Sequence, residues 1–168
     1  IILIVSHKDS QSWVDSPGAY DNAVGVVSNM EIARILSNYE SIRSIYFLFC
    51  NEEHTPWTSI TAAKNFKMRG DNLIAVINID AIGGKSKEEA ETGAKTNVTL
   101  YTTDEGEKIA DLMIELNKIY NIGLIQRKYK RTSPGDDDGS FIKEGYKVAV
   151  ANIGSYPYAD PNYHDEKD

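Results

Sequence analysis

The 168-residue sequence is long enough for one domain with a sizeable core, and its 41% hydrophobic and 26% charged residues are ordinary for a globular protein. Its formal net charge of −7 argues against a nucleic-acid-binding protein, which usually carries a basic patch. No apolar run reaches the roughly 20 residues of a membrane span, and a single cysteine, Cys50, excludes an internal disulfide bond.

Strand-like apolar runs alternate with helical patterns along the chain. In chain order they predict a strand at 1–6, a helix at 23–38, a strand at 44–50, a helix at 58–69, strands at 73–80 and 98–102, a helix at 105–120, a strand at 124–127, a helix at 138–144 and a strand at 148–153. The polar stretch at 85–97 is expected to be an exposed loop or a short excursion. This alternation predicts an α/β fold with a largely parallel sheet covered on both faces. We expect a single domain over residues 1–168, and the abrupt start inside an apolar run suggests an excerpt of a longer domain.

Two adjacent carboxylates, Glu52 and Glu53, come directly after the strand-like run at 44–50. Open α/β sheets carry their ligand-binding sites at the carboxyl ends of their strands, so this pair is expected at that edge of the sheet. Adjacent like charges repel unless a metal, a proton or a basic partner offsets them. The alternative interpretation is a solvated pair at a strand-to-helix turn.

Further histidines and carboxylates lie at or after the ends of other runs. His7 and Asp9 follow the first run, and residues two apart on an extended chain point the same way, so Asp9 could accept the spare N–H of His7. Asp21 precedes the first helix and could instead cap it. Asp80 ends the third run and could be a turn residue. His164 follows the last run and could be an ordinary loop residue.

The candidate ligands combine imidazole and carboxylate groups without a thiolate, which is typical of zinc sites. Two ions sharing a bridging carboxylate would suit five such ligands and leave Glu52 as a base. Two divalent ions would also change the formal charge from −7 to about −3. The acidic run at 136–138 is interpreted as a helix start with favourable dipole contacts. His54 is interpreted as a neighbour of the site and not a ligand.

Five short segments carry a resemblance that spans the whole chain. They are residues 6–10 (SHKDS), 17–26 (PGAYDNAVGV), 51–53 (NEE), 79–83 (IDAIG) and 163–168 (YHDEKD). In this order they resemble the zinc aminopeptidases of the bacterial leucyl-aminopeptidase type, a family of dizinc exopeptidases related to glutaminyl cyclases. The resemblance implies a three-layer sandwich whose central, mostly parallel mixed sheet is flanked by helices, with further elements before residue 1 and after residue 168.

The resemblance also implies a role for each matching residue. The five metal ligands for two Zn²⁺ ions are His7, Asp21, Glu53, Asp80 and His164. Asp21 would bridge the ions, with His7 and Asp80 completing one and Glu53 and His164 the other. Glu52 would be the general base for a dizinc-activated water. Asp9 would support His7, and Tyr163 would help to stabilise the oxyanion.

The expected function is therefore zinc-dependent hydrolysis of the N-terminal residue from peptides that carry a free N-terminus. The alternatives are a single-zinc enzyme similar to glutaminyl cyclases and a catalytically silent domain of the same fold. Departures from the family pattern occur at Asn51, at Asp165 and at 136–138, where Ser-Asp-His is common. These departures put the substrate preference in doubt and leave the five ligands unaffected. The resemblance is compatible with a secreted, periplasmic or membrane-anchored protein, and the sequence does not decide between them or give the oligomeric state.

Overall fold

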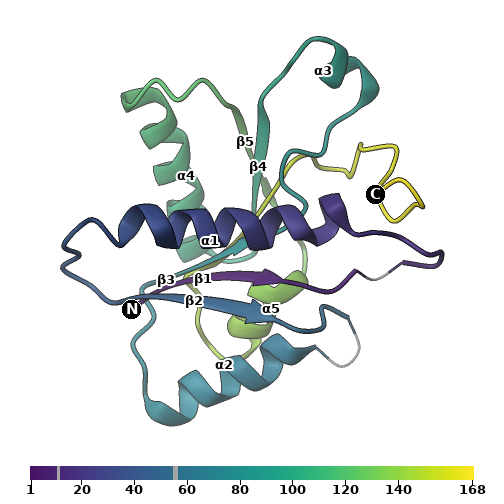
Figure 1. Ribbon diagram of the computed structural model, residues 1–168. Coiled ribbons are helices and arrows are strands. Elements are labelled where there is room, and N and C mark those ends of the chain that lie inside the picture. Colours follow the sequence, from purple (N-terminus) through teal and green to yellow (C-terminus); the bar gives the residue numbers. More distant parts are fainter. Residues whose placement is uncertain (11, 55–56) are drawn as a thin grey trace.

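A six-stranded sheet between helices forms the protein, as the computed structural model of residues 1–10, 12–54 and 57–168 shows (Figure 1). The strands are β1 (Ile2–His7), β2 (Ile45–Cys50), β3 (Ala75–Ile79), β4 (Thr96–Tyr101), β5 (Ile125–Lys130) and β6 (Ala149–Ile153). The helices are α1 (Val24–Leu36), α2 (Thr58–Arg69), α3 (Lys87–Glu91), α4 (Asp104–Ile119) and α5 (Asp136–Lys143), and a π-helical turn, η1 (Ala19–Ala23), precedes α1.

The strands lie in the order β2-β1-β3-β6-β4-β5. Every neighbouring pair is parallel except β4 and β6, which are antiparallel. The sheet is therefore mixed and mostly parallel, as the sequence predicts. Parallel strands need crossover connections, and the helices between the strands supply them.

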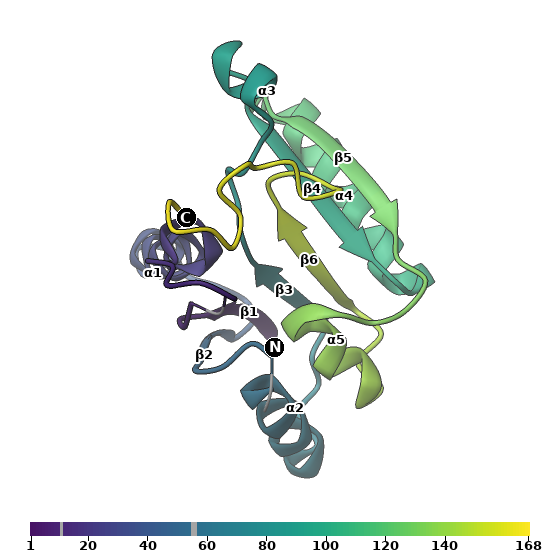
Figure 2. The ribbon, with the colours of Figure 1, turned by 90° about the vertical axis from the view of Figure 1, so that its right-hand side faces the viewer.

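Helices cover both faces of the sheet. Leu3, Val76 and Ala149 are register partners on one face, where they pack with Phe66 of α2 and Phe141 of α5. The opposite face carries Ile4, Ile77 and Val150, which are register partners in the same three strands. Val150 packs against Ala110 of α4. Ser6 shares the face of Ile4 and accepts a hydrogen bond from Asn29 of α1 at 3.2 Å. The predicted three-layer arrangement is confirmed (Figure 2).

Several predicted bounds are wrong by a few residues. β1 includes His7, and β4 begins at Thr96, two residues before the predicted start at 98. β5 continues to Lys130 because backbone pairing with β4 extends it beyond its apolar residues. α5 starts at Asp136, and the polar stretch at 85–97 contains α3, whose capping box at Ser86 and Glu89 defines its start.

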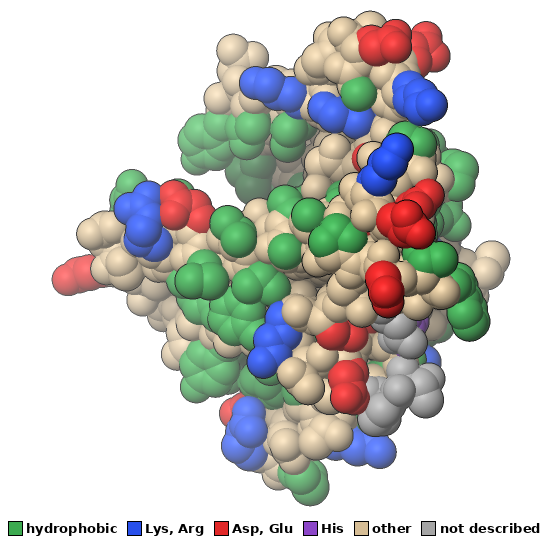
Figure 3. Space-filling view, turned by 45° about the vertical axis from the view of Figure 1, so that its right-hand side comes forward, with side chains coloured by type: hydrophobic (Ala, Val, Ile, Leu, Met, Phe, Trp, Pro, Cys, Tyr) green, Lys and Arg blue, Asp and Glu red, His purple; other side chains and the backbone are tan. Residues whose placement is uncertain are grey.

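Three strands deliver candidate residues to one edge of the sheet. His7 is the last residue of β1, Glu52 and Glu53 follow β2, and Asp80 follows β3. β1, β2 and β3 are parallel neighbours, so their carboxyl ends lie side by side. Figure 3 shows several Asp and Glu side chains on the right half of this face of the molecule. No helix among the described residues is long and apolar enough to cross a membrane.

Candidate metal centre

His7 lies at the middle of a ring of carboxylates. Its side chain is 1% exposed, and Nε2 is 3.0 Å from Oδ1 of Asp21, 3.2 Å from Oδ1 of Asp80 and 3.7 Å from Oε2 of Glu53. The donor atoms of His7, Asp21 and Asp80 all lie within 4.8 Å of one another. Four candidate ligands, contributed by three strand ends and a loop, therefore meet at one point.

The carboxylate of Asp21 lies between two imidazoles. Oδ1 faces Nε2 of His7, and Oδ2 is 2.9 Å from Nε2 of His164. The alternative that Asp21 caps α1 is not what the structure shows, because the N-cap position of α1 is Ala23 and the helix has no side-chain cap at that position. Asp168 holds this turn, since its Oδ1 accepts hydrogen bonds from the backbone N–H groups of Tyr20 (2.8 Å) and Asp21 (3.0 Å).

Asn22 fixes the Asp21 turn against the end of β3. Its Nδ2 donates to the carbonyl oxygen of Ile79 at 2.9 Å, and its Oδ1 accepts from the backbone N–H groups of Gly25 and Ala81. A Cβ at Gly25 would come within 2.2 Å of Asn22 Oδ1 and 2.5 Å of the Ile79 oxygen. Because Gly25 has no side chain, Asn22 can make these hydrogen bonds. They set the position of Asp21 relative to Asp80.

Asp9 supports the cluster from a second direction. Its Oδ1 lies 3.2 Å from Nδ1 of His7, and its Oδ2 accepts a hydrogen bond from the backbone N–H of Glu53 at 3.2 Å. One carboxylate thus orients the imidazole of His7 and the chain that carries Glu53. This geometry fits the supporting role expected for Asp9, because a partner on the far nitrogen directs Nε2 toward the other carboxylates.

Burial and crowding shift the pKa values of these groups strongly. Burial, with the nearby charge of Asp80, raises the pKa of Glu53 to about 10. Burial also raises the pKa of Asp80 to about 7. For His7, burial opposes the charged form, but the close carboxylates of Asp21 and Asp80 outweigh it and raise its pKa to about 12. The pKa of Asp21 is lowered because its two imidazole partners outweigh burial. These carboxylates cannot all ionise comfortably without more positive charge.

The donor set fits divalent metal ions. Oδ1 of Asp21 is buried and lies 3.0 Å from Nε2 of His7, but this contact is not a hydrogen bond and the described residues provide no other partner. A polar atom left in that state is costly unless a ligand or ion completes it. Imidazole nitrogens and carboxylate oxygens are ligands that zinc accepts, and closely spaced acids are what two cations would need. His7, Asp21 and Asp80 could hold one ion, and Glu53 with His164 could join Asp21 around a second.

Glu52 differs from Glu53 in its surroundings. Glu53 is buried, whereas Glu52 is half-buried and its carboxylate has no hydrogen bond or ion pair with the described part of the chain. The hydroxyl of Thr58 accepts from the backbone N–H of Glu52 at 3.2 Å and donates to its carbonyl oxygen at 3.1 Å. The backbone of Glu52 is thus fixed while its side chain is free to handle a proton.

An aromatic stack leads away from His164. The ring of Tyr163 lies 4.0 Å from that of His164 and 4.4 Å from that of Tyr158, nearly parallel to both. Burial, together with nearby acids, raises the pKa of the Tyr163 hydroxyl, so it stays protonated as a donor. Tyr163 therefore keeps a hydrogen that it can donate, and its ring stacks on the candidate ligand His164.

Asp136 belongs to the cluster, although its sequence context predicts only the start of a helix. Its carboxylate lies with those of Glu53 and Asp80 in a group whose ligand atoms are within 4.8 Å of one another. Arg131 binds it through Nη1 at 2.6 Å and also pairs with buried Asp138. The run at 136–138 does begin a helix, as predicted, but Asp137 and Asp138 are fully buried and Asp136 faces the ligands. Three consecutive acids two residues after a proline are the only sequence signal for this.

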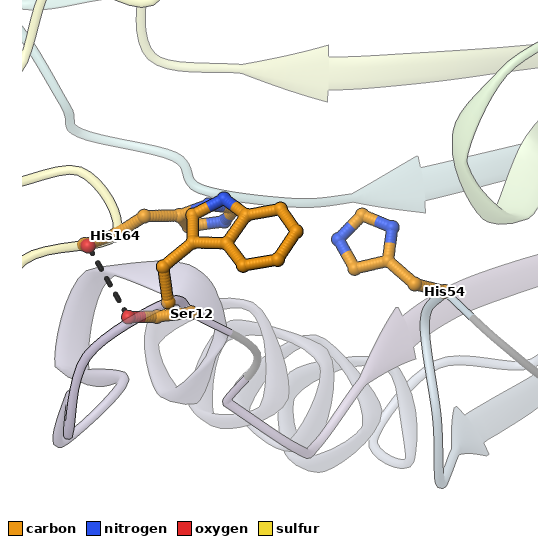
Figure 4. Close-up of a pocket in the computed structure, with 4 residues that line it drawn as sticks. Ser12, His54 and His164 are labelled. Carbon is orange, nitrogen blue, oxygen red and sulfur yellow. Dashed lines mark hydrogen bonds between the residues drawn. The ribbon is translucent and has the colours of Figure 1, made fainter.

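One cavity borders the candidate ligand His164, and a second borders Asp136. One, of about 350 Å³, is lined by Ser12, Trp13, His54 and His164. Oγ of Ser12 donates to the carbonyl oxygen of His164 at 3.2 Å, and the rings of His164 and His54 face this space (Figure 4). Nε2 of His54 is 3.1 Å from Oε2 of Glu53, so His54 is a neighbour of the site as expected. The second cavity, of about 320 Å³, includes Asp136 in its lining.

A three-layer α/β sandwich with imidazoles and carboxylates at the carboxyl edge of its sheet is the zinc-exopeptidase fold. The chain belongs to peptidase family M28, whose family model matches residues 1–168. It is 30% identical over 131 residues to a protein of Pyrenophora tritici-repentis described as a probable zinc metalloprotease, covering 77% of this chain and 28% of that one. The chain thus spans less than a third of that relative's length.

Solved structures share the fold at low sequence identity. The LapA aminopeptidase of Legionella pneumophila matches with a TM-score of 0.81 at 22% identity, over 99% of this chain and 44% of that one. A glutaminyl cyclase of Bacteroides thetaiotaomicron matches with a TM-score of 0.72 at 20% identity, over 98% of this chain and 63% of that one. The resemblance to both groups that the sequence motifs indicate is confirmed at the level of the fold.

Proposed function

We propose that this protein is a metallo-aminopeptidase that removes the N-terminal residue from peptides with a free N-terminus. The observation that carries the proposal is the position of Asp21, whose two oxygens each face a different histidine, His7 and His164. A carboxylate in that position suits two metal ions a few ångströms apart. Membership of peptidase family M28 supports peptides as the substrate class.

In this proposal His7 and Asp80 would hold one Zn²⁺, Glu53 and His164 would hold the other, and Asp21 would be shared by both. Bound zinc supplies Lewis acidity, which polarises a peptide carbonyl and acidifies a water molecule. The protein's own residues orient the ligands and hold the backbone that carries them. Asp9 keeps Nε2 of His7 directed at the acids, and Asn22 holds the Asp21 turn against β3.

Glu52 is assigned as the general base. Its carboxylate is half-buried and unpaired with the described residues, so it can take a proton from water and later give it to the leaving amine. Tyr163 is assigned as a hydrogen-bond donor to the oxyanion, because the raised pKa keeps its hydroxyl protonated and its ring stacks on the candidate ligand His164. Glu53, in contrast, is buried against His7 and suits a ligand.

Metal analysis combined with an activity assay tests the proposal. Purified protein should contain near two zinc ions per chain and hydrolyse an aminoacyl-anilide, and activity should disappear with a chelator and return with zinc. Near one ion per chain, with cyclisation of N-terminal glutamine and no anilide hydrolysis, would instead support a function like that of the glutaminyl cyclases. Binding of neither metal nor substrate would indicate a silent domain and contradict the proposal.

A further inference from the structure

Asp136 places its carboxylate beside those of the candidate metal ligands Glu53 and Asp80. Oδ2 is bound by Nη1 of Arg131 at 2.6 Å, and the described residues provide no hydrogen bond to Oδ1. The Asp136 side chain is 21% exposed, whereas that of Arg131 is 10% exposed. Arg131 also reaches Asp138, which is completely buried, so its guanidinium is fixed from two sides. Asp136 is therefore a positioned carboxylate with one oxygen available to a ligand.

The cavity beside Asp136 lies at the ends of β4 and β5. Its lining includes Leu100, Lys130, Tyr156 and Tyr158 besides Asp136. Tyr158 stacks on Tyr163, which in turn stacks on His164, so an aromatic wall connects this cavity to a candidate metal ligand. Asp136 and the stacked rings therefore each connect this cavity with the candidate metal ligands.

An N-terminal residue needs three things at such a site: an acceptor for its α-ammonium group, room for its side chain and a path for its carbonyl to the metal ions. Resting on the proposed function, we propose that Asp136 accepts the substrate's α-ammonium group and that the side chain of the same residue enters the cavity beside it. An ammonium group bound to Oδ1 of Asp136 would form a charge-assisted hydrogen bond at the edge of the carboxylate cluster.

The arrangement favours this role for Asp136 over that of a sixth metal ligand. Its Oδ2 is already bound by Arg131, which leaves one oxygen, Oδ1, for a further partner such as a single ammonium N–H. The other five candidate ligands already supply both imidazoles and the bridging carboxylate. Asp136 also comes from the start of α5, at the rim of the cavity, while His7, Glu53 and Asp80 come from the ends of β1, β2 and β3.

The test uses two hydroxamates that differ only in the amino group: leucine hydroxamic acid and 4-methylpentanohydroxamic acid. Both bind zinc through the hydroxamate, so the ratio of their dissociation constants measures recognition of the ammonium group. Calorimetry on the zinc-loaded wild-type protein should show tighter binding of the amino compound. In Asp136→Asn this ratio should fall about tenfold, since a charged acceptor is lost, while zinc content stays unchanged.

Asp136→Glu should restore part of the ratio, and Asp136→Ser provides a second neutral variant should Asp136→Asn fold poorly. Asp15→Asn is the matched control, because Asp15 is an exposed acid that does not line this cavity and its loss should leave the ratio unchanged. An unchanged ratio in both neutral variants overturns the proposal, as does loss of zinc from them, which would make Asp136 a ligand. Failure of the wild-type protein to hydrolyse aminoacyl-anilides contradicts the proposed function separately, because the hydroxamate ratio does not depend on turnover.

Discussion

Oδ2 of Asp21 lies 2.9 Å from Nε2 of His164, although 143 residues separate the two in the sequence. The other oxygen of Asp21 faces His7 at 3.0 Å. One carboxylate therefore connects the first strand with the segment that follows the last strand. Its charge should matter to both metal positions at once, whereas the neighbouring Glu52 should matter only to catalysis.

Glu52→Gln should retain zinc and lose turnover by a factor on the order of hundreds or more, because the base is removed and no ligand is changed. Asp21→Asn should instead lose zinc, since it removes the charge between the two histidines. Metal analysis after dialysis and the rate of anilide hydrolysis measure both outcomes. Near wild-type turnover in Glu52→Gln would reject Glu52 as the base.

Asp9→Asn should weaken zinc binding by roughly 10–100-fold, as is common when a partner that orients a histidine ligand is altered. The reason is that Asp9 binds both Nδ1 of His7 and the backbone N–H of Glu53. Competition with a chromophoric chelator measures the affinity. Asp15→Asn, in an exposed turn, is the control and should behave like the wild type. Equal zinc affinities for Asp9→Asn and Asp15→Asn would argue against this role.

Gly25→Ala should destabilise the protein by about 1–3 kcal/mol, the usual cost of overpacking. Its Cβ would overlap Asn22 Oδ1, so the Asp21 turn would also move and zinc affinity should fall. Urea denaturation gives the free energy of unfolding. Met30→Ala, on the exposed face of the same helix, should change neither quantity strongly. A fully stable Gly25→Ala protein with normal zinc binding would show that Asn22 does not fix the turn.

Asp137→Asn should stabilise the protein above pH 6 more than at pH 4. Burial raises the pKa of Asp137 to about 6, and neither of its oxygens has a hydrogen-bond partner in the described structure. With a folded pKa above the unfolded value of about 3.9, the native state holds a proton that the unfolded state releases. Stability therefore falls as pH rises from about 4 to 6, by an amount on the order of 3 kcal/mol.

Asparagine keeps the shape of Asp137 without its charge and should remove this dependence. Urea denaturation of chelator-treated wild type and variant at the two pH values measures it, with Asp104→Asn as the exposed control. A difference in unfolding free energy between variant and wild type that is the same at both pH values would contradict the shift at Asp137.

The sequence predicts the sheet and the strand-end residues well because both depend on local patterns. Apolar runs identify the strands, and parallel pairing then brings His7, Glu53 and Asp80 to one edge. The positions of Asp21 and His164 are different, because they lie in irregular backbone whose course depends on distant contacts such as those of Asp168. Their places beside predicted elements made both residues candidates, and the family resemblance gave each its role as a ligand.

Asp136 shows where sequence reasoning fails. Acids at a helix start are common, and that interpretation accounts for the pattern locally. What brings Asp136 into the cluster is a long-range arrangement: Arg131 holds it beside the ends of β2 and β3. The packing of α5 against α2, β3 and β6 places the start of that helix, and no short sequence motif predicts it.

The segment after β6 has no strand partner, yet it carries His164 and Tyr163. Within the described structure it is held near Asp21 by a few polar contacts, from Ser12 and Asp168, and by stacked rings. An ion shared by Asp21 and His164 would act as a reversible cross-link between distant parts of the chain. Part of its binding energy would offset the entropy of closing that loop, so zinc affinity and resistance of this segment to proteolysis should rise and fall together.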